Sequence, residues 1–145
     1  MTHEPRLLIN IDVPDIEAGL AFYTAALGLH VGRRFDAEFV ELLGAEAPIY
    51  LLKKDAGTPT APGAGERRRY SRHWCPVHPD FVIEDMDVAI ARATAAGAVQ
   101  EGKTREAPYG RLAMFADPFG HGFCLIEFKR GGYDALLPKA AAQPS

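Results

Sequence analysis

The chain has 145 residues, of which 48% are hydrophobic and 24% charged, so it fits one globular domain or two small halves that share a core. Its 16 Lys and Arg residues stand against 19 Asp and Glu residues, and this formal charge of −3 lacks the basic excess that nucleic-acid binding requires. We find neither an export signal nor a stretch apolar enough to span a membrane, and the two cysteines suit a reducing compartment. We therefore expect a cytoplasmic protein whose partners include neither nucleic acid nor membranes.

The first half of the chain predicts a strand, a helix and three further strands. Residues 7–13 are mostly apolar or β-branched and are followed by Pro14, which is typical of a strand and its end. Apolar residues then recur at helical spacing between Asp15, a good N-cap, and Gly28, a good C-cap. Three strand-like stretches follow, at residues 29–35, 39–43 and 49–53.

A segment rich in Gly and Pro separates the two halves. Residues 55–65 show no apolar periodicity, which indicates a linker or a mobile loop. The segment continues into the charged run Glu66–Arg69, which is either a solvated loop or a lid for an anionic ligand. The sequence leaves these two interpretations open.

The second half repeats the pattern of the first. Aligning Asp15 with Asp85 pairs apolar residues with apolar residues along the first strand and the helix, which indicates an internal duplication. The second helix is expected to begin after Asp85 or Asp87 and to end at Gly97, while residues 117–120 have the preferences of a type I turn. Three more strands are expected, at residues 99–103, 111–116 and 122–129. The single domain then comprises module one, 7–54, a linker, 55–72, module two, 73–130, and a tail, 131–145, whose last residues, 140–145, are expected to be disordered.

The duplicated βαβββ unit, the first helix with its flanks (Val13–Leu29) and the closing sequence Asp117–His121 together resemble the vicinal oxygen chelate superfamily. This superfamily contains the glyoxalases, the bleomycin-resistance proteins and the extradiol dioxygenases, and the resemblance covers about residues 7–130. It implies an α+β fold in which two tandem βαβββ modules form a cleft from curved mixed sheets, often in a homodimer. In metal-using members, the cleft holds a divalent ion on four His or Glu side chains, two from each module.

The resemblance also implies where those four ligands would lie. The equivalent positions are Leu8, Tyr50, His78 and Cys124. A leucine has no donor atom, whereas catalytic Zn²⁺ or Fe²⁺ sites need about three protein ligands. Glu127 would supply a carboxylate only if the strand register slipped, and its side chain would then face the other side of the sheet. We therefore expect no metal cofactor, and His78 and Cys124 are the candidate ligands if a divalent ion binds.

Strand alternation predicts which side chains line the cleft. Alternate residues of the first strand of each module, among them Asn10 and Asp80, share a face opposite the apolar residues that pack on the helices. His78 beside Asp80 could act as a general base, or the two side chains could simply satisfy each other. Cys124 is expected to be a small buried hydrophobic residue rather than a nucleophile. The expected ligand-binding residues are Asn10, Tyr50, His78, Asp80, Cys124, Trp74 and Arg111.

Two of those residues have an alternative interpretation. Trp74 either covers one edge of the cleft or packs against a partner subunit, and Arg111 either meets an anionic group or stays solvated. We expect a protein similar to glyoxalases and bleomycin-resistance proteins that binds an organic small molecule without the superfamily's metal chelate. The alternative is a metal-dependent lyase or isomerase of the glyoxalase type, or a dioxygenase, for which His78 is the candidate catalytic residue.

Overall fold

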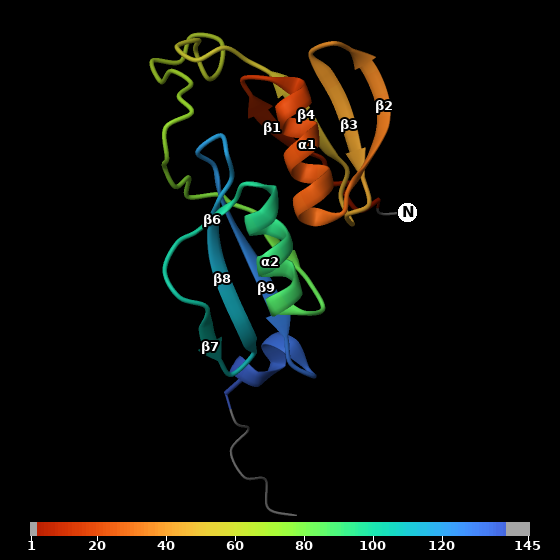
Figure 1. Ribbon diagram of the computed structural model, residues 1–145, viewed down its shortest axis with the longest axis vertical. Coiled ribbons are helices and arrows are strands. Elements are labelled where there is room, and N and C mark those ends of the chain that lie inside the picture. The colour runs from red at the N-terminus through yellow and green to blue at the C-terminus, as the bar shows by residue number, and fades with distance from the viewer. Residues whose placement is uncertain (1–2, 139–145) are drawn as a thin grey trace, which may run out of the picture.

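The computed structural model describes residues 3–138, and each half of the chain folds into one helix packed on its own mixed sheet (Figure 1). Module one contains β1 (Ile9–Val13), α1 (Ile16–Leu27), β2 (His30–Asp36), β3 (Phe39–Leu43) and β4 (Ile49–Lys53), in the sheet order β1-β4-β3-β2. Module two contains β5 (Asp80–Val82), α2 (Met86–Ala96), β6 (Val99–Gln100), β8 (Gly110–Ala116) and β9 (Gly122–Phe128), in the order β5-β9-β8-β6, and β7 (Arg105–Ala107) pairs with β8. The expected α+β class with tandem βαβββ modules is confirmed.

Both helices begin and end at the residues that the sequence predicts. The side chain of Asp15 accepts a backbone N–H of α1 at 2.9 Å, and Asp85, rather than Asp87, does the same for α2 at 3.2 Å. Each helix ends at a glycine in the left-handed region, with φ of 70° at Gly28 and 115° at Gly97, where a side chain would be strained. Local chemistry therefore fixes the helix ends.

The duplication extends to the register of the strands. In module one, β1 pairs with β4 in parallel so that Asn10 lies opposite Tyr50. In module two, β5 pairs with β9 in parallel so that Asp80 lies opposite Cys124. Because Asn10 aligns with Asp80, the first and last strands of both modules carry equivalent residues at equivalent places.

The two modules share one core because α1 packs against α2 (Figure 1). Two hydrogen bonds between residues far apart in the sequence also connect α1 to module two. The buried hydroxyl of Tyr23 in α1 donates to Asp117, in the turn before β9, at 2.5 Å. The guanidinium of Arg92 in α2 donates to the carbonyl of Ala25 near the end of α1, at 2.9 Å. The inner faces of both sheets supply the largest buried side chains of the core, among them Leu42, Ile49, Leu51, Phe115 and Leu125.

Two expected strand bounds differ from the structure by two residues or more, and two elements were not expected. The first strand begins at Ile9 and not at residue 7, and the expected strand at 99–103 ends at Gln100 because the chain turns at Gly102, where φ is 77°. A separate short strand, β7, follows the turn and was not expected. A 3₁₀ helix, η1 (Gly132–Leu136), forms in the tail, while the expected disorder of residues 140–145 lies outside the described part of the chain. No helix among residues 3–138 is long and apolar enough to cross a membrane.

Candidate functional site

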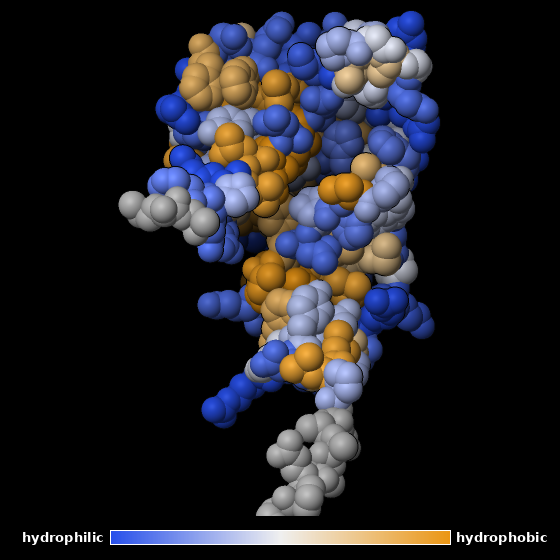
Figure 2. Space-filling view, turned by 180° about the vertical axis from the view of Figure 1, so that it is seen from behind, coloured by the Kyte–Doolittle hydropathy of each residue, from blue (hydrophilic) through white to orange (hydrophobic). Residues whose placement is uncertain are grey.

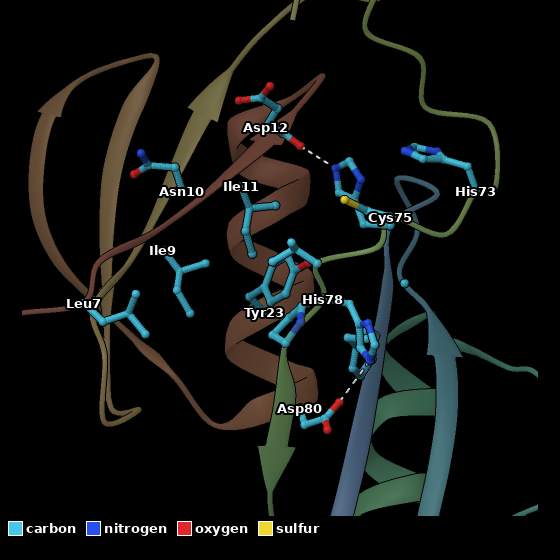
Figure 3. A pocket seen from close by; sticks show the side chains of 15 residues that line it. Leu7, Ile9, Asn10, Ile11, Asp12, Tyr23, His73, Cys75, His78 and Asp80 are labelled. Atoms are coloured by element: carbon cyan, nitrogen blue, oxygen red, sulfur yellow. Dashed lines mark hydrogen bonds and ion pairs between the residues drawn. The ribbon is translucent and has the colours of Figure 1, made fainter.

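A cavity of about 630 Å³ lies between the modules, beside the edge strands β1 and β5 (Figure 3). Asn10 and Asp12 of β1 border it on one side, His78 and Asp80 border it on the other, and Tyr23 of α1 lies between them. Most of the remaining lining is apolar: Leu7, Ile9, Ile11, Val77 and Phe123. Figure 2 shows hydrophobic residues running down the middle of one face of the molecule. A cavity of this size with a few polar groups is typical of small-molecule sites, which measure about 300–1,000 Å³.

Six of the seven predicted site residues lie at the cavity or next to residues that line it. Asn10, His78 and Asp80 line the cavity directly. Cys124 lies next to Asp80 in the sheet, and donor atoms of Cys124, Asp80 and His78 all lie within 4.8 Å of one another. Tyr50 lies next to Asn10 in the sheet of module one, as its register partner on β4. Together with Trp74, whose ring packs on that of His78, these residues are divided between the two modules, two in module one and four in module two.

The polar residues of module two form a small cluster. His78 Nε2 lies 3.4 Å from Asp80 Oδ1, and both side chains are about one-third exposed, at 37% and 38% (Figure 3). Cys124 is only 3% exposed, and this burial, together with the nearby Asp80 carboxylate, raises the pKa of its thiol to about 12. Cys124 is thus a buried side chain whose raised pKa keeps the thiol protonated at neutral pH, and a protonated thiol is a poor nucleophile.

Tyr50 belongs to a salt-bridge network that the sequence analysis missed. Its hydroxyl donates to Glu41 Oε2 at 2.9 Å, and Arg33 binds the same carboxylate through Nε and Nη2 at 3.1 and 2.7 Å. Glu41 is 5% exposed, and its hydrogen bonds from Arg33, with a smaller contribution from Tyr50, lower its pKa to about 2. A Glu within the otherwise apolar strand Phe39–Leu43 was the signal that could have revealed a buried, paired carboxylate.

Trp74 packs edge-on against His78, with ring centroids 5.3 Å apart, whereas Arg111 lies away from the polar cluster. The indole of Trp74 donates to Glu101 at 2.8 Å, and the guanidinium of Arg72 stacks over its ring at 4.5 Å. Arg111 donates to Glu127 at 3.0 and 3.1 Å, on the side of the sheet where Glu127 also accepts the first backbone N–H of α2. The structure therefore places Trp74 against His78 beside the cavity and Arg111 on the helix-bearing face of the sheet.

The charged end of the linker is tied to module one. Arg68 donates to Asp12 at 2.7 Å and also binds the carbonyls of Pro59 and Thr60, so this arginine holds the linker in place. The carbonyl of Asp12 contacts His121 Nε2 at 2.7 Å, which connects the same strand to module two. Asp12 and His121 both line the cavity; strand alternation predicts Asp12 on this face, whereas His121 was expected at the surface or at an interface.

The four ligand positions implied by the superfamily do not form a metal site. Leu8 has no donor atom and is half-exposed, and the hydroxyl of Tyr50 is engaged by Glu41. The two module-one positions of the superfamily's chelate therefore leave no free donor. The donors that remain, His78, Asp80 and Cys124, all belong to module two.

Comparison with known sequences gives the family of the chain. Residues 8–126 match the family described as the glyoxalase-like domain. The anthracycline biosynthesis protein DnrV of Streptomyces peucetius is 30% identical over 125 residues, which cover 85% of this chain and 41% of DnrV. The chain therefore spans less than half the length of this curated relative.

Solved structures share the fold. The fosfomycin resistance protein FosX from Listeria monocytogenes superposes with a TM-score of 0.69 at 19% identity, covering 94% of this chain and 100% of FosX. Another FosX structure contains Mn(II) and a dihydroxypropylphosphonic acid. TnmS3, an antibiotic binding protein from Streptomyces sp. CB03234, superposes with a TM-score of 0.59 at 23% identity, covering 89% of this chain and 99% of TnmS3. At these sequence identities, the similarity to the solved structures shows a shared fold and nothing more.

Proposed function

Because the chain belongs to the glyoxalase-like domain family of the vicinal oxygen chelate superfamily, we propose that it binds an organic small molecule in the cavity between its modules, without the superfamily's four-ligand metal chelate. The observation that carries this proposal is the cavity of about 630 Å³, whose walls are mostly apolar and whose polar groups come from both modules. Such a lining would hold an apolar body by burial and orient it through a few hydrogen bonds.

The relatives suggest the class of ligand. DnrV is named for anthracycline biosynthesis and TnmS3 for antibiotic binding, so we propose a largely apolar compound of antibiotic size. Asn10, His78 and Asp80 would hydrogen-bond its polar groups, and Tyr23 with the apolar lining would contact its rings. The largely apolar lining favours binding, which is the function that we propose.

We also propose a cytoplasmic homodimer. Cys75 is an exposed free thiol and Cys124 a buried one, which suits a reducing compartment. Large hydrophobic residues stay exposed in one chain, and a second copy that covered them would remove them from water. They include Leu8, Val77, Val82, Tyr133, Leu136 and Leu137.

Titration of the purified protein with a fluorescent anthracycline, in buffer containing EDTA, tests the binding proposal. We expect His78→Ala and Asn10→Ala each to weaken binding roughly fivefold, because one lost hydrogen bond costs about 1 kcal/mol. His30→Ala, on the exposed strand β2, is the matched control and should bind as the wild type does. Tyr50→Phe keeps the ring and reports whether module one reaches the ligand. Unchanged affinity in both cavity variants, with unfolding midpoints preserved, would show that the site is placed wrongly.

A further inference from the structure

The linker between the modules is folded against itself and borders a second cavity, of about 460 Å³, which we call the linker cavity. Two stretches of the linker form a short antiparallel pair: the backbone N–H of Arg68 donates to the carbonyl of Thr58 at 2.8 Å, and that of Gly57 donates to the carbonyl of Arg68 at 2.8 Å. The charged run Glu66–Arg69 lines the linker cavity together with Trp74. This run is therefore held in place beside a cavity.

The linker cavity adjoins the cavity between the modules. The same four residues line both cavities and form the border between them: Asp12, His73, Cys75 and His121. A ligand bound between the modules is therefore next to the linker cavity at this border. The lining of the first cavity is mostly apolar, whereas that of the second includes three arginines. Together they suit a molecule with an apolar body and a charged substituent.

The arginines of the linker carry positive charge that the carboxylates of the lining do not balance. Arg68 is already engaged, because its guanidinium binds Asp12 at 2.7 Å and the two side chains are only 16% and 34% exposed. Within residues 3–138, Arg67 and Arg69 form no ion pair, and Arg67 donates only to a backbone carbonyl, at 2.9 Å. Glu66 is the one other carboxylate among the described residues of the lining. Two unpaired guanidinium groups thus stand against one carboxylate.

We propose that the linker cavity binds an anionic group, a carboxylate or a phosphate, carried by the molecule whose apolar body lies between the modules. This inference rests on the proposed function, because it assigns a charge to the same ligand. Arg67 and Arg69 donate N–H groups to the anionic oxygens, for which the planar fork of a guanidinium is well suited. Arg68 is a positioning residue, since its bond to Asp12 holds the linker against β1.

Three probes that share one naphthalene ring test this inference: 2-naphthoate, 2-naphthyl phosphate and the neutral 2-naphthamide. In fluorescence titrations of the full chain at low ionic strength, we expect at least one anionic probe to bind about fivefold more tightly than the amide. This preference should decrease in about 0.5 M NaCl because salt screens the charges. The anionic probe with the larger preference identifies the group that the linker cavity accepts.

Variants of the two unpaired arginines locate the charge that causes the preference. Arg67→Gln and Arg69→Gln should each reduce the preference for the anionic probe, and the double variant should abolish it. Both residues are exposed, so these variants should fold as the wild type does. The affinity for 2-naphthamide should stay unchanged, because the neutral probe uses only the cavity between the modules.

Arg130→Gln is the matched control. Arg130 is an exposed arginine that lines neither cavity, so this variant removes the same charge from the molecule and leaves the linker intact. Its preference for the anionic probe should equal that of the wild type. Equal binding of all three probes to the wild type, or an equal loss of preference in Arg130→Gln and in the linker variants, would overturn the inference. If His78→Ala still weakened binding of the amide, the cavity proposal would stand, whereas failure of all three probes to bind would count against both proposals.

Discussion

Glu41 is the clearest case of a single residue whose environment determines its charge. It lies 5% exposed on β3, yet it remains ionised because Arg33 and Tyr50 direct N–H and O–H donors at both of its oxygens. A buried charge is tolerated only when it is paired and hydrogen-bonded in this way. The network holds the hydroxyl of Tyr50 against Glu41, its register partner on the neighbouring strand.

Replacing Glu41 by Gln should reduce stability in a pH-dependent way. The pKa of Glu41 in the folded protein is about 2, below its ordinary value of 4.5, so between these values the unfolded chain binds the extra proton. Its stabilising contribution is therefore complete above the ordinary pKa and is lost as the pH falls toward 2. Thermal unfolding of both proteins by circular dichroism should show a midpoint difference that is constant near neutrality and shrinks below pH 4.5.

Glu17→Gln is the control for that experiment. Glu17 forms an ion pair with Arg34 in which the two side chains are 77% and 53% exposed, and exposed pairs contribute little. Its unfolding midpoint should follow the wild type at every pH. A difference between Glu41→Gln and the wild type that did not vary with pH would contradict a role for the ionised carboxylate.

At the scale of elements, the start of β9 packs so closely on the segment before β5 that only a glycine fits. A Cβ at Gly122 would overlap the indole ring of Trp74, so Gly122→Ala should displace the ring from its hydrogen bond to Glu101. Trp74 is the single tryptophan of the chain, and its fluorescence reports this contact alone. We expect a red-shifted emission maximum and stronger quenching by acrylamide in this variant. Gly65→Ala, where a Cβ meets no atom within 4 Å, should leave the spectrum unchanged, and an unshifted Gly122→Ala spectrum would contradict the close packing.

What the sequence could predict at this scale depended on how local the signal was. The caps Asp15 and Gly28 act within one helical turn, so the sequence predicts the ends of α1. The alternation that puts Asp80 on the face lining the cavity acts within one strand, so the sequence predicts this position too. Arg111 was expected in the cleft, but it lies on the other side of the sheet, next to its register partner Glu127. Periodicity within one strand does not specify this pairing between strands. The bond between Arg68 and Asp12 spans 56 positions and left no local trace.

At the scale of the whole molecule, the exposed hydrophobic residues predict self-association. Sedimentation equilibrium should report a dimer, and the unfolding midpoint should fall on dilution because dissociation is coupled to unfolding. Val82→Asp, on edge strand β5 beside the cavity, should weaken the dimer. Val88→Asp is the control: Val88 is 63% exposed and Val82 is 64% exposed, but Val88 lies on α2, so this variant should leave the dimer intact. A monomer at micromolar concentration, with unfolding independent of dilution, would contradict this prediction.

The hydrogen bond between Tyr23 and Asp117 joins residues 94 positions apart and has a consequence for how the protein is made. As the chain leaves the ribosome, module one emerges first, and domains tend to fold in that order. Yet the hydroxyl of Tyr23 has no native acceptor until Asp117 has been synthesised, and the end of α1 still lacks Arg92. The first half of the nascent chain is therefore an incomplete folding unit, and the two copies of the duplicated motif reach their native state together.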